Sequence, residues 1–160
     1  MQVSPVPVLG MDSETFLIGA GDIMPRMVCA TFDWSDGQGN ERAWGVSNGD
    51  PYALDHLLHA WQGAHQRSTH LVWHEAPFDI CVYMRYCQDI ISGAQPGDAS
   101  KARDLYMLMW EVLDQSMSDE HAGGQSMVHC TILREKLYNL STHGGIESYH
   151  GRDLSYNLHA

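Results

Sequence analysis

The order of strand-like and helix-like segments is the feature that most constrains the fold of this chain. An apolar run at 6–11 ends in acidic residues, and it predicts a first strand. The segments 26–34 and 42–46 are rich in residues that suit a pleated surface, and Asp-Gly-Gln-Gly-Asn at 36–40 separates them. A turn cluster between two such runs predicts an antiparallel β-hairpin.

The rest of the chain alternates between helical and extended patterns. Asp50-Pro51 predicts the start of a helix that reaches residue 63, because Asp favours the N-cap and Pro the first helical position. We further expect strands at 69–73 and 126–130, helices at 77–93, 100–115 and 131–140, polar connecting stretches at 116–125 and 141–152, and a further element from 154 to 160. This order predicts an α/β fold with flanking helices and a mixed sheet, in which parallel strands follow the hairpin.

Length and charge narrow the classes of function. A chain of 160 residues with 44% hydrophobic content is sufficient for one domain, 1–160, with a real core. The formal net charge of −11 has the wrong sign for a protein that grips duplex DNA through its phosphates. An acidic chain can still act on nucleic acid when divalent cations lie between its carboxylates and the phosphate, so the charge favours catalysis over wrapping or storage.

The cysteines and the first residues indicate the setting of the protein. The four cysteines include no C-x-x-C pair, and a chain of this length does not require disulfides for stability. The first residues have neither a basic segment nor a long apolar run, and no window approaches the roughly 20 apolar residues of a membrane helix. We therefore expect a cytoplasmic protein without a membrane partner.

Two carboxylates at the end of the first strand are the leading candidates for chemistry. Side chains alternate along a strand, so Asp12 and Glu14 point to one face while Met11 and Ser13 point to the other. Carboxylates this close repel each other unless they share a proton or a cation, and a hard divalent ion such as Mg²⁺ or Mn²⁺ satisfies both. Asp79 lies just inside the helix that follows the strand at 69–73, and it approaches this pair if the two strands are neighbours.

Three ordered segments resemble the proofreading 3'-to-5' exonuclease domains of family A-like DNA polymerases of the phage and bacterial type. Asp-Ser-Glu-Thr at 12–15 resembles the first motif, D-x-E-T, and the stretches 16–19 and 25–29 are similar to the segments that follow it. His-Glu-Ala-Pro-Phe-Asp at 74–79 resembles the second motif, H-N-x-x-[FY]-D. The segment 128–137 is similar to [VF]-x-D-T-x-[LI]-x-x-x-L, so the resemblance runs from about residue 9 to about residue 140.

The resemblance implies an RNase H-like fold and hydrolysis of a terminal phosphodiester by two magnesium or manganese ions, held about 4 Å apart. Asp12 would ligate both ions, Glu14 would hold the first and orient water, and Asp79 would complete the shell of the second. The implied partners are the 3' end of single-stranded DNA and a polymerase domain fused downstream. The residues implied to contact the substrate are Thr15, Phe16, His74 and Phe78.

The chain departs from the family pattern at three places. Glu75 stands where the second motif usually has Asn, and Cys130 stands where the later segment usually has Asp. The third motif, Y-x-x-x-D or H-x-x-x-x-D, is expected beyond residue 160, so we hypothesise that the domain is incomplete at its C-terminal end. A catalytically inactive module that binds DNA or scaffolds a polymerase is the alternative, and the choice between DNA and RNA stays open.

Each candidate residue also has a purely structural interpretation. Asp12 and Glu14 can be solvated carboxylates, Asp79 can favour its helix dipole, and Thr131 is interpreted first as a helix cap. The ten histidines suggest zinc, but no cysteine pairs with His70 or His74 at zinc-finger spacing. The cations available to meet phosphates, or to be ordinary surface charge, are Arg26, Lys101, Arg103, Arg134 and Lys136.

Overall fold

The computed structural model describes residues 6–16, 24–117 and 127–143. Five strands and four helices follow one another in these segments. The strands are β1 Val8–Thr15, β2 Met27–Ser35, β3 Glu41–Ser47, β4 His70–Trp73 and β5 Val128–Cys130. The helices are α1 Ala53–His65, α2 Ala76–Ile91, α3 Ala99–Met117 and α4 Thr131–His143.

The strands form one mixed sheet in the order β3-β2-β1-β4-β5. β1 pairs with β2 and β2 with β3 in antiparallel fashion, whereas β4 runs parallel to both β1 and β5. The predicted hairpin is confirmed as β2-β3, in which Phe32 lies opposite Trp44 and the two rings stack at a centroid distance of 5.1 Å. The predicted α/β fold with an antiparallel hairpin followed by parallel strands is therefore confirmed.

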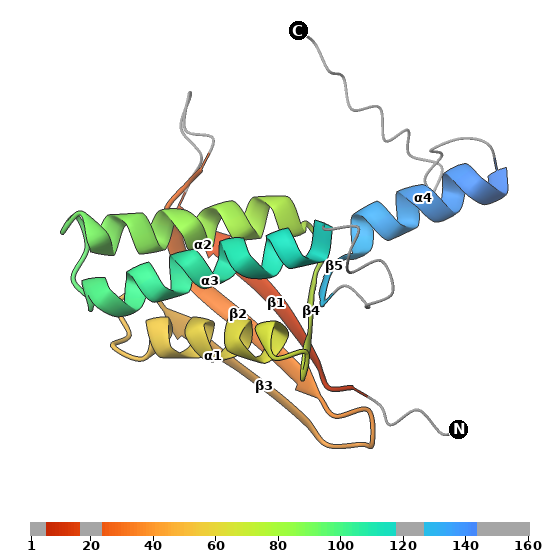
Figure 1. Cartoon of the computed structure of the whole chain (residues 1–160), viewed down its shortest axis with the longest axis horizontal. Helices are drawn as coiled ribbons and strands as arrows, with labels where there is room; N and C mark the ends of the chain where they lie inside the picture. The colour runs from red at the N-terminus through yellow and green to blue at the C-terminus, as the bar shows by residue number, and fades with distance from the viewer. Residues whose placement is uncertain (1–5, 17–23, 118–126, 144–160) are drawn as a thin grey trace, which may run out of the picture.

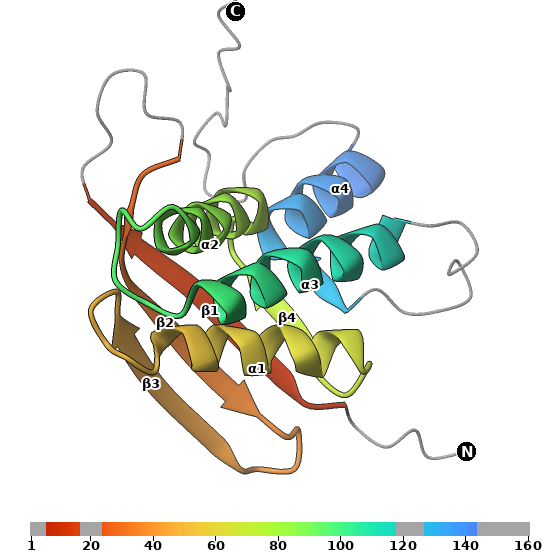
Figure 2. The same cartoon turned by 60° about the vertical axis from the view of Figure 1, so that its left-hand side comes forward.

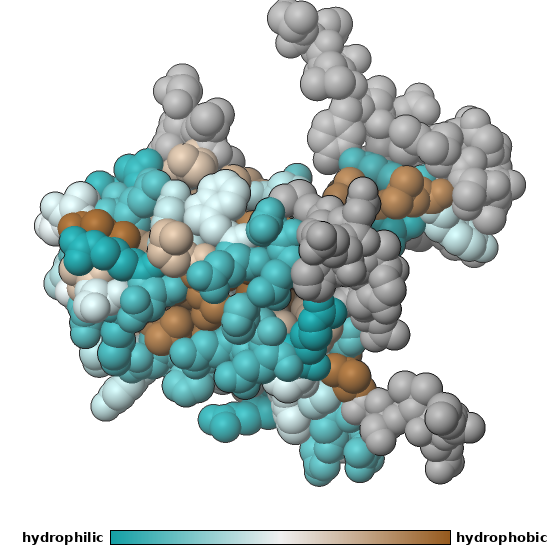
Figure 3. Space-filling model, in the orientation of Figure 1, coloured by the Kyte–Doolittle hydropathy of each residue, from teal (hydrophilic) through white to brown (hydrophobic). Residues whose placement is uncertain are grey.

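The helices are distributed unequally about the sheet. α1, α2 and α3 lie together on one face, and α4 projects from the edge of the sheet beyond β5 (Figures 1 and 2). The outer surface of this helical layer is mostly hydrophilic (Figure 3). None of the described helices covers the opposite face of β1, β2 and β3, which is called the uncovered face below (Figures 1 and 2).

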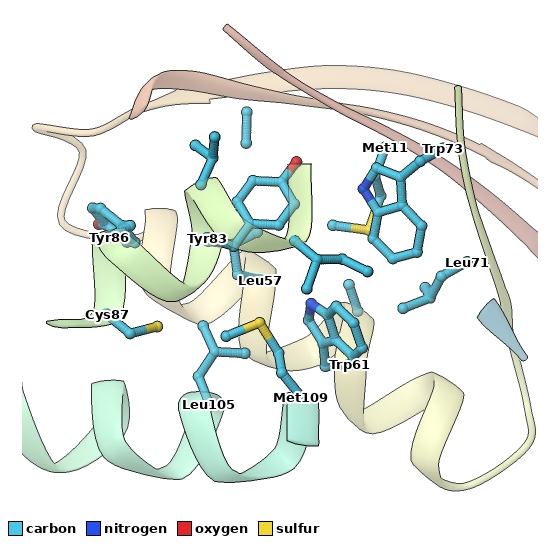
Figure 4. Packing of buried hydrophobic residues seen from close by; sticks show 14 of the residues in the cluster. Met11, Leu57, Trp61, Leu71, Trp73, Tyr83, Tyr86, Cys87, Leu105 and Met109 are labelled. Carbon is cyan, nitrogen blue, oxygen red and sulfur yellow. The ribbon is translucent and has the colours of Figure 1, made fainter. Parts of the chain in front are cut away.

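The core lies between the sheet and the helical layer. Trp73 of β4 and Trp61 of α1 are fully buried, with ring centroids 5.6 Å apart, and Leu57 and Met109 pack in the same cluster (Figure 4). The apolar stripe of each helix supplies these contacts, as helical periodicity predicts. Burial of this apolar surface is the main favourable contribution to folding, and it fixes α1 and α2 on the sheet.

The starts of two elements differ from the sequence prediction. α1 begins at Ala53 rather than at Asp50, because the carboxylate of Asp50 accepts the backbone N–H of Tyr52 at 2.8 Å and forms a turn before the helix. β1 begins at Val8 rather than at residue 6, and it carries the acidic residues at its C-terminal end as predicted, since β2 pairs with β1 as far as Thr15. The predicted glycine stop of α2 is confirmed, because Gly93 follows the helix with φ 76°.

Several predicted connections lie largely outside the described residues. α3 continues to Met117, so the first two residues of the expected loop at 116–125 are helical, and the rest of that loop is not among the described residues. α4 continues to His143, three residues beyond its predicted end. The remainder of the stretch 141–152 and the element expected at 154–160 also fall outside the described part of the chain.

Membrane insertion finds no support in the helices. None of those in the described segments combines the length and the apolar character that crossing a bilayer requires.

The core is expected to dominate stability. Leu57→Ala removes a side chain with no solvent exposure, and we expect it to lower the free energy of unfolding by about 2–5 kcal/mol. Leu137→Ala is the matched control, because Leu137 is 65% exposed on α4, and about 0.5 kcal/mol or less is expected there. Urea unfolding followed by circular dichroism measures both, and equal losses would contradict the described packing.

Candidate functional site

β1 presents two carboxylates on the uncovered face of the sheet. The side chains that point toward the helices are buried, and they are those of Leu9, Met11 and Ser13. The alternate side chains near the end of the strand, Asp12 and Glu14, are exposed. The alternation predicted from the sequence is therefore confirmed, and the two carboxylates share a face. Tyr83 of α2 donates a hydrogen bond to the backbone oxygen of Asp12 at 3.0 Å, which fixes the strand at this position.

Asp79 reaches β1 from the first turn of α2. Its Oδ1 accepts hydrogen bonds from the backbone N–H of Ser13 at 3.0 Å and from the Ser13 hydroxyl at 2.6 Å. The pairing between β1 and β4 covers Val8 to Gly10 on β1, so Ser13 lies beyond the end of its parallel neighbour. A buried backbone N–H requires an acceptor, and the Asp79 carboxylate takes the place of the missing strand.

The electrostatics of Asp79 connect it to Asp12. Asp79 is 2% exposed, and this burial raises the pKa of its carboxyl above the ordinary value. The hydrogen bond from the Ser13 side chain opposes that rise, and the negative charges of Asp12 and Glu75 add to it. Asp12 and Asp79 thus lie close enough to repel each other, and a cation placed between them would relieve that repulsion.

A shallow concavity of about 630 Å³ lies beside Asp12 on the uncovered face. Its lining includes Gly10 and Asp12 of β1 together with Thr31 and Asp33 of β2. Asp33 stands opposite Gly10, so a carboxylate that the sequence analysis did not single out shares this hollow with Asp12. Alternation along 26–34 places Thr31 and Asp33 on one face, but only the register with β1 reveals that this face carries Asp12.

His74 and Thr131 form another part of the lining, beyond the ends of β4 and β5. The Nδ1 atom of His74 lies 3.0 Å from the Thr131 hydroxyl, and the backbone oxygen of His74 accepts from the Cys130 thiol at 3.4 Å. Thr131 is the first helical residue of α4, one position after the place of an N-cap, and its hydroxyl joins the two connections. Cys130 therefore helps to hold the backbone of His74 in place.

The other residues expected to contact substrate differ in their availability. Phe16 follows β1 and is 55% exposed, whereas Phe78 is half-buried and packs against the core. Thr15 is half-buried at the end of β1, where the register with β2 shifts. Phe16 is thus the aromatic side chain with more free surface for stacking on a base.

The acidic residues do not form a ready-made metal cage. Within the described residues, no group of three or more His, Cys, Asp or Glu side chains is positioned to hold a metal ion. Asp12 interacts with Asp79, and Glu14 shares the face of Asp12, but the three carboxylates do not converge on one point. The zinc alternative gains no support either, because His70 pairs with His129 rather than with His74.

Comparisons of the chain with models of protein families, with curated proteins and with solved structures give no match. The function is therefore inferred from the residues and their geometry.

The raised pKa of Asp79 predicts a cost in stability at neutral pH. A carboxyl whose pKa is higher in the native state favours folding at low pH, and that advantage is lost as the pH rises above the unfolded value of about 3.9. We expect Asp79→Asn, measured in EDTA, to raise the melting temperature at pH 7 by about 2–4 °C per kcal/mol regained. The gain should vanish near pH 3.

Thermal unfolding across this pH range tests the expectation, with Asp104→Asn on α3 as the control for loss of one exposed carboxylate. A lower melting temperature for Asp79→Asn at pH 7 would mean that the charged hydrogen bonds to Ser13 outweigh the cost of burial.

Proposed function

We propose that this chain is the 3'-to-5' exonuclease module of a family A-like DNA polymerase, with an RNase H-like fold. It removes 3'-terminal nucleotides from single-stranded DNA ends with two magnesium or manganese ions. The mixed sheet supports this proposal, because the antiparallel hairpin and the following parallel strands match the strand pattern that the sequence resemblance implies.

The contact between Ser13 and Asp79 is the main observation that supports the proposal. The first and second motif-like segments are 66 residues apart at Ser13 and Asp79, yet they meet in two hydrogen bonds. If the two segments resembled the motifs only by chance, there would be no reason for Ser13 of the first segment to contact Asp79 at the end of the second. Ser13 directly follows Asp12, and Asp12 lines the concavity on the uncovered face of the sheet.

The chemistry of the three carboxylates suits hard divalent ions, which would have to draw the side chains toward one point. Asp12, Glu14 and Asp79 offer carboxylate oxygens, which Mg²⁺ and Mn²⁺ prefer. Repulsion from Asp12 contributes to the raised pKa of Asp79, and a bound cation would reverse that contribution. The ions would supply an activated water and stabilisation of the departing 3'-oxygen.

The protein's own residues would hold and orient the reactants. Asp12 would bind both ions, Glu14 would bind one and orient the water, and Asp79 would complete the set from α2. Phe16 would stack on the terminal base with its exposed ring. Phe78, at the edge of the core, would pack against the same base. Thr15 and His74 would contact the terminal nucleotide.

A second candidate is a catalytically inactive module that binds DNA or scaffolds a polymerase. Glu75, which replaces the usual Asn, adds a negative charge that further raises the pKa of Asp79. Cys130, which replaces the usual Asp, donates to a backbone oxygen. The Glu75 carboxylate would disturb how the DNA strand is held, because it repels phosphate groups, and Cys130 supplies no carboxylate, so both features favour a module without hydrolysis.

Degradation of a 3'-labelled single strand with manganese tests the proposal. We expect the protein extended beyond residue 160 to shorten the strand from its 3' end, and Asp12→Asn in the same extended protein to lower the rate by at least about 100-fold, since the carboxylate is needed to hold both ions. Asp104→Asn is the matched control, because it removes one exposed carboxylate from α3.

Three outcomes separate the candidates. Loss of degradation in Asp12→Asn alone supports the exonuclease. Binding of the strand without metal-dependent shortening, in the wild type and in the variants alike, supports the inactive module. Equal degradation by wild type and Asp12→Asn would remove Asp12 from the mechanism, and a parallel assay with an RNA strand decides between the two nucleic acids.

A further inference from the structure

Two histidines and an arginine form a hydrogen-bonded chain on the uncovered side of β4 and β5. The Nδ1 atom of His70 lies 2.6 Å from the Nε2 atom of His129, and the Nδ1 atom of His129 lies 2.6 Å from a terminal guanidinium nitrogen of Arg134. The two imidazole centroids are 4.8 Å apart. Neither the proposed exonuclease site nor the core uses these three side chains.

The chemistry of arginine fixes the direction of this chain. A guanidinium only donates hydrogen bonds, so Nδ1 of His129 accepts and the proton of the neutral ring lies on Nε2. That N–H donates to Nδ1 of His70, which leaves the proton of the neutral His70 ring on its Nε2. The cluster therefore offers outward donors, the His70 Nε2–H and the remaining N–H groups of Arg134, and such a set of donors suits an anion.

Arg134 supplies the positive charge of the cluster, and several other cations of the described residues are already paired with carboxylates. Arg26 and Arg85 both pair with Asp89, and Lys101 pairs with Asp55 at 2.7 Å. Among the described residues, Arg134 forms no ion pair with a carboxylate and bonds to a histidine instead. Burial and the neighbouring Arg134 cation lower the pKa of His129 to about 4, so the positive charge stays on the arginine.

The cluster adjoins the concavity beside Asp12. Val72 of β4 lies opposite both Gly10 of β1 and His129 of β5, so these three residues cross the sheet in one row. Adjacent strands are about 4.8 Å apart, which places His129 on the order of 10 Å from Gly10. Alternation along β4 puts His70 on the same face as Val72, which faces that hollow.

The first turn of α4 brings Arg134 to the same side. Thr131 and Arg134 are three residues apart and therefore lie on one side of the helix, and Thr131 lines the concavity. The apolar side of α4, with Leu133 and Leu137, forms a groove with α2 and α3, and His129 and Arg134 also contribute to the lining of that groove. Figure 3 shows the brown surface of this apolar side.

We propose that Arg134, His129 and His70 bind a phosphodiester group of a single-stranded nucleic acid that crosses the open face of the sheet toward Asp12. The proposal takes the identity of the ligand from the proposed function. The cluster supplies the cationic contact that the acidic concavity lacks, and it holds the strand behind its reactive end. Arg134 provides the charge, and the two histidines orient the donors.

Binding of a fluorescent oligothymidylate in EDTA tests the cluster, because hydrolysis cannot proceed without metal. We expect Arg134→Gln to weaken binding about 10-fold at low salt and to lower the slope of log K against log salt concentration by about 0.7. His70→Phe, which keeps a ring but loses the outward N–H, should weaken binding about threefold. Fluorescence anisotropy measures both, and thermal unfolding checks that each variant is folded.

Arg103→Gln is the matched control, because it removes the same charge from α3 on the helical layer. We expect it to weaken binding by no more than about twofold, since salt screens so distant a charge. Equal effects of Arg103→Gln and Arg134→Gln, an unchanged affinity in Arg134→Gln, or no binding by the wild type would each overturn the cluster.

The two proposals fail in different ways. If Asp12-dependent hydrolysis is absent while Arg134→Gln still weakens binding in EDTA, the exonuclease falls and the phosphate cluster stands. If hydrolysis depends on Asp12 while Arg134→Gln binds like the wild type, the cluster falls and the exonuclease stands.

Discussion

The two hydrogen bonds from Ser13 to Asp79 hold the first turn of α2 against β1, and the arrangement of the candidate site depends on them. β4 separates from β1 after Gly10, so the edge of β1 would otherwise expose an unpaired N–H in a buried position. A carboxylate from the helix fills that place. Because the acceptor is a carboxylate rather than a neutral amide, the junction carries a charge close to Asp12, and it is unfavourable without a cation.

The sequence predicts the local features of this region well. Alternation along β1 correctly places Asp12 and Glu14 on one face, and the turn cluster at 36–40 correctly predicts the hairpin. These features depend on residues a few positions apart, so a short stretch of sequence contains the information. The prediction is wrong at the start of α1, where the Asp50 carboxylate accepts the backbone N–H of Tyr52 in a turn before the helix instead of capping the helix.

The remaining features of the site depend on which strands become neighbours and in what register. Asp33 joins Asp12 only because β2 pairs with β1 with Gly10 opposite Asp33. His70 and His129 are 59 residues apart, and they meet because β5 adds beside β4. A shift of one residue would send either side chain to the other face of the sheet, so spacing within one segment cannot reveal these contacts.

The distribution of charge across the uncovered face connects both proposals. Asp12 and Asp33 line the concavity, and Arg134 of α4 contacts His129 of β5. Acidic groups that would hold cations and a basic group that would hold a phosphate together suit a polyanionic substrate in a chain whose net charge is −11. The cluster takes the identity of its ligand from the proposed exonuclease function, but the two sites depend on different residues and can be tested separately.

A crystal structure of the chain grown with manganese, with the ion positions taken from anomalous scattering, tests the central claim most directly. The proposed site predicts manganese bound by the carboxylate oxygens of Asp12 at the C-terminal end of β1, with Glu14 and Asp79 turned toward it. Two peaks about 4 Å apart would match two-metal hydrolysis. A structure with manganese bound elsewhere, and with Asp79 still hydrogen-bonded to Ser13 beside a metal-free Asp12, would contradict it.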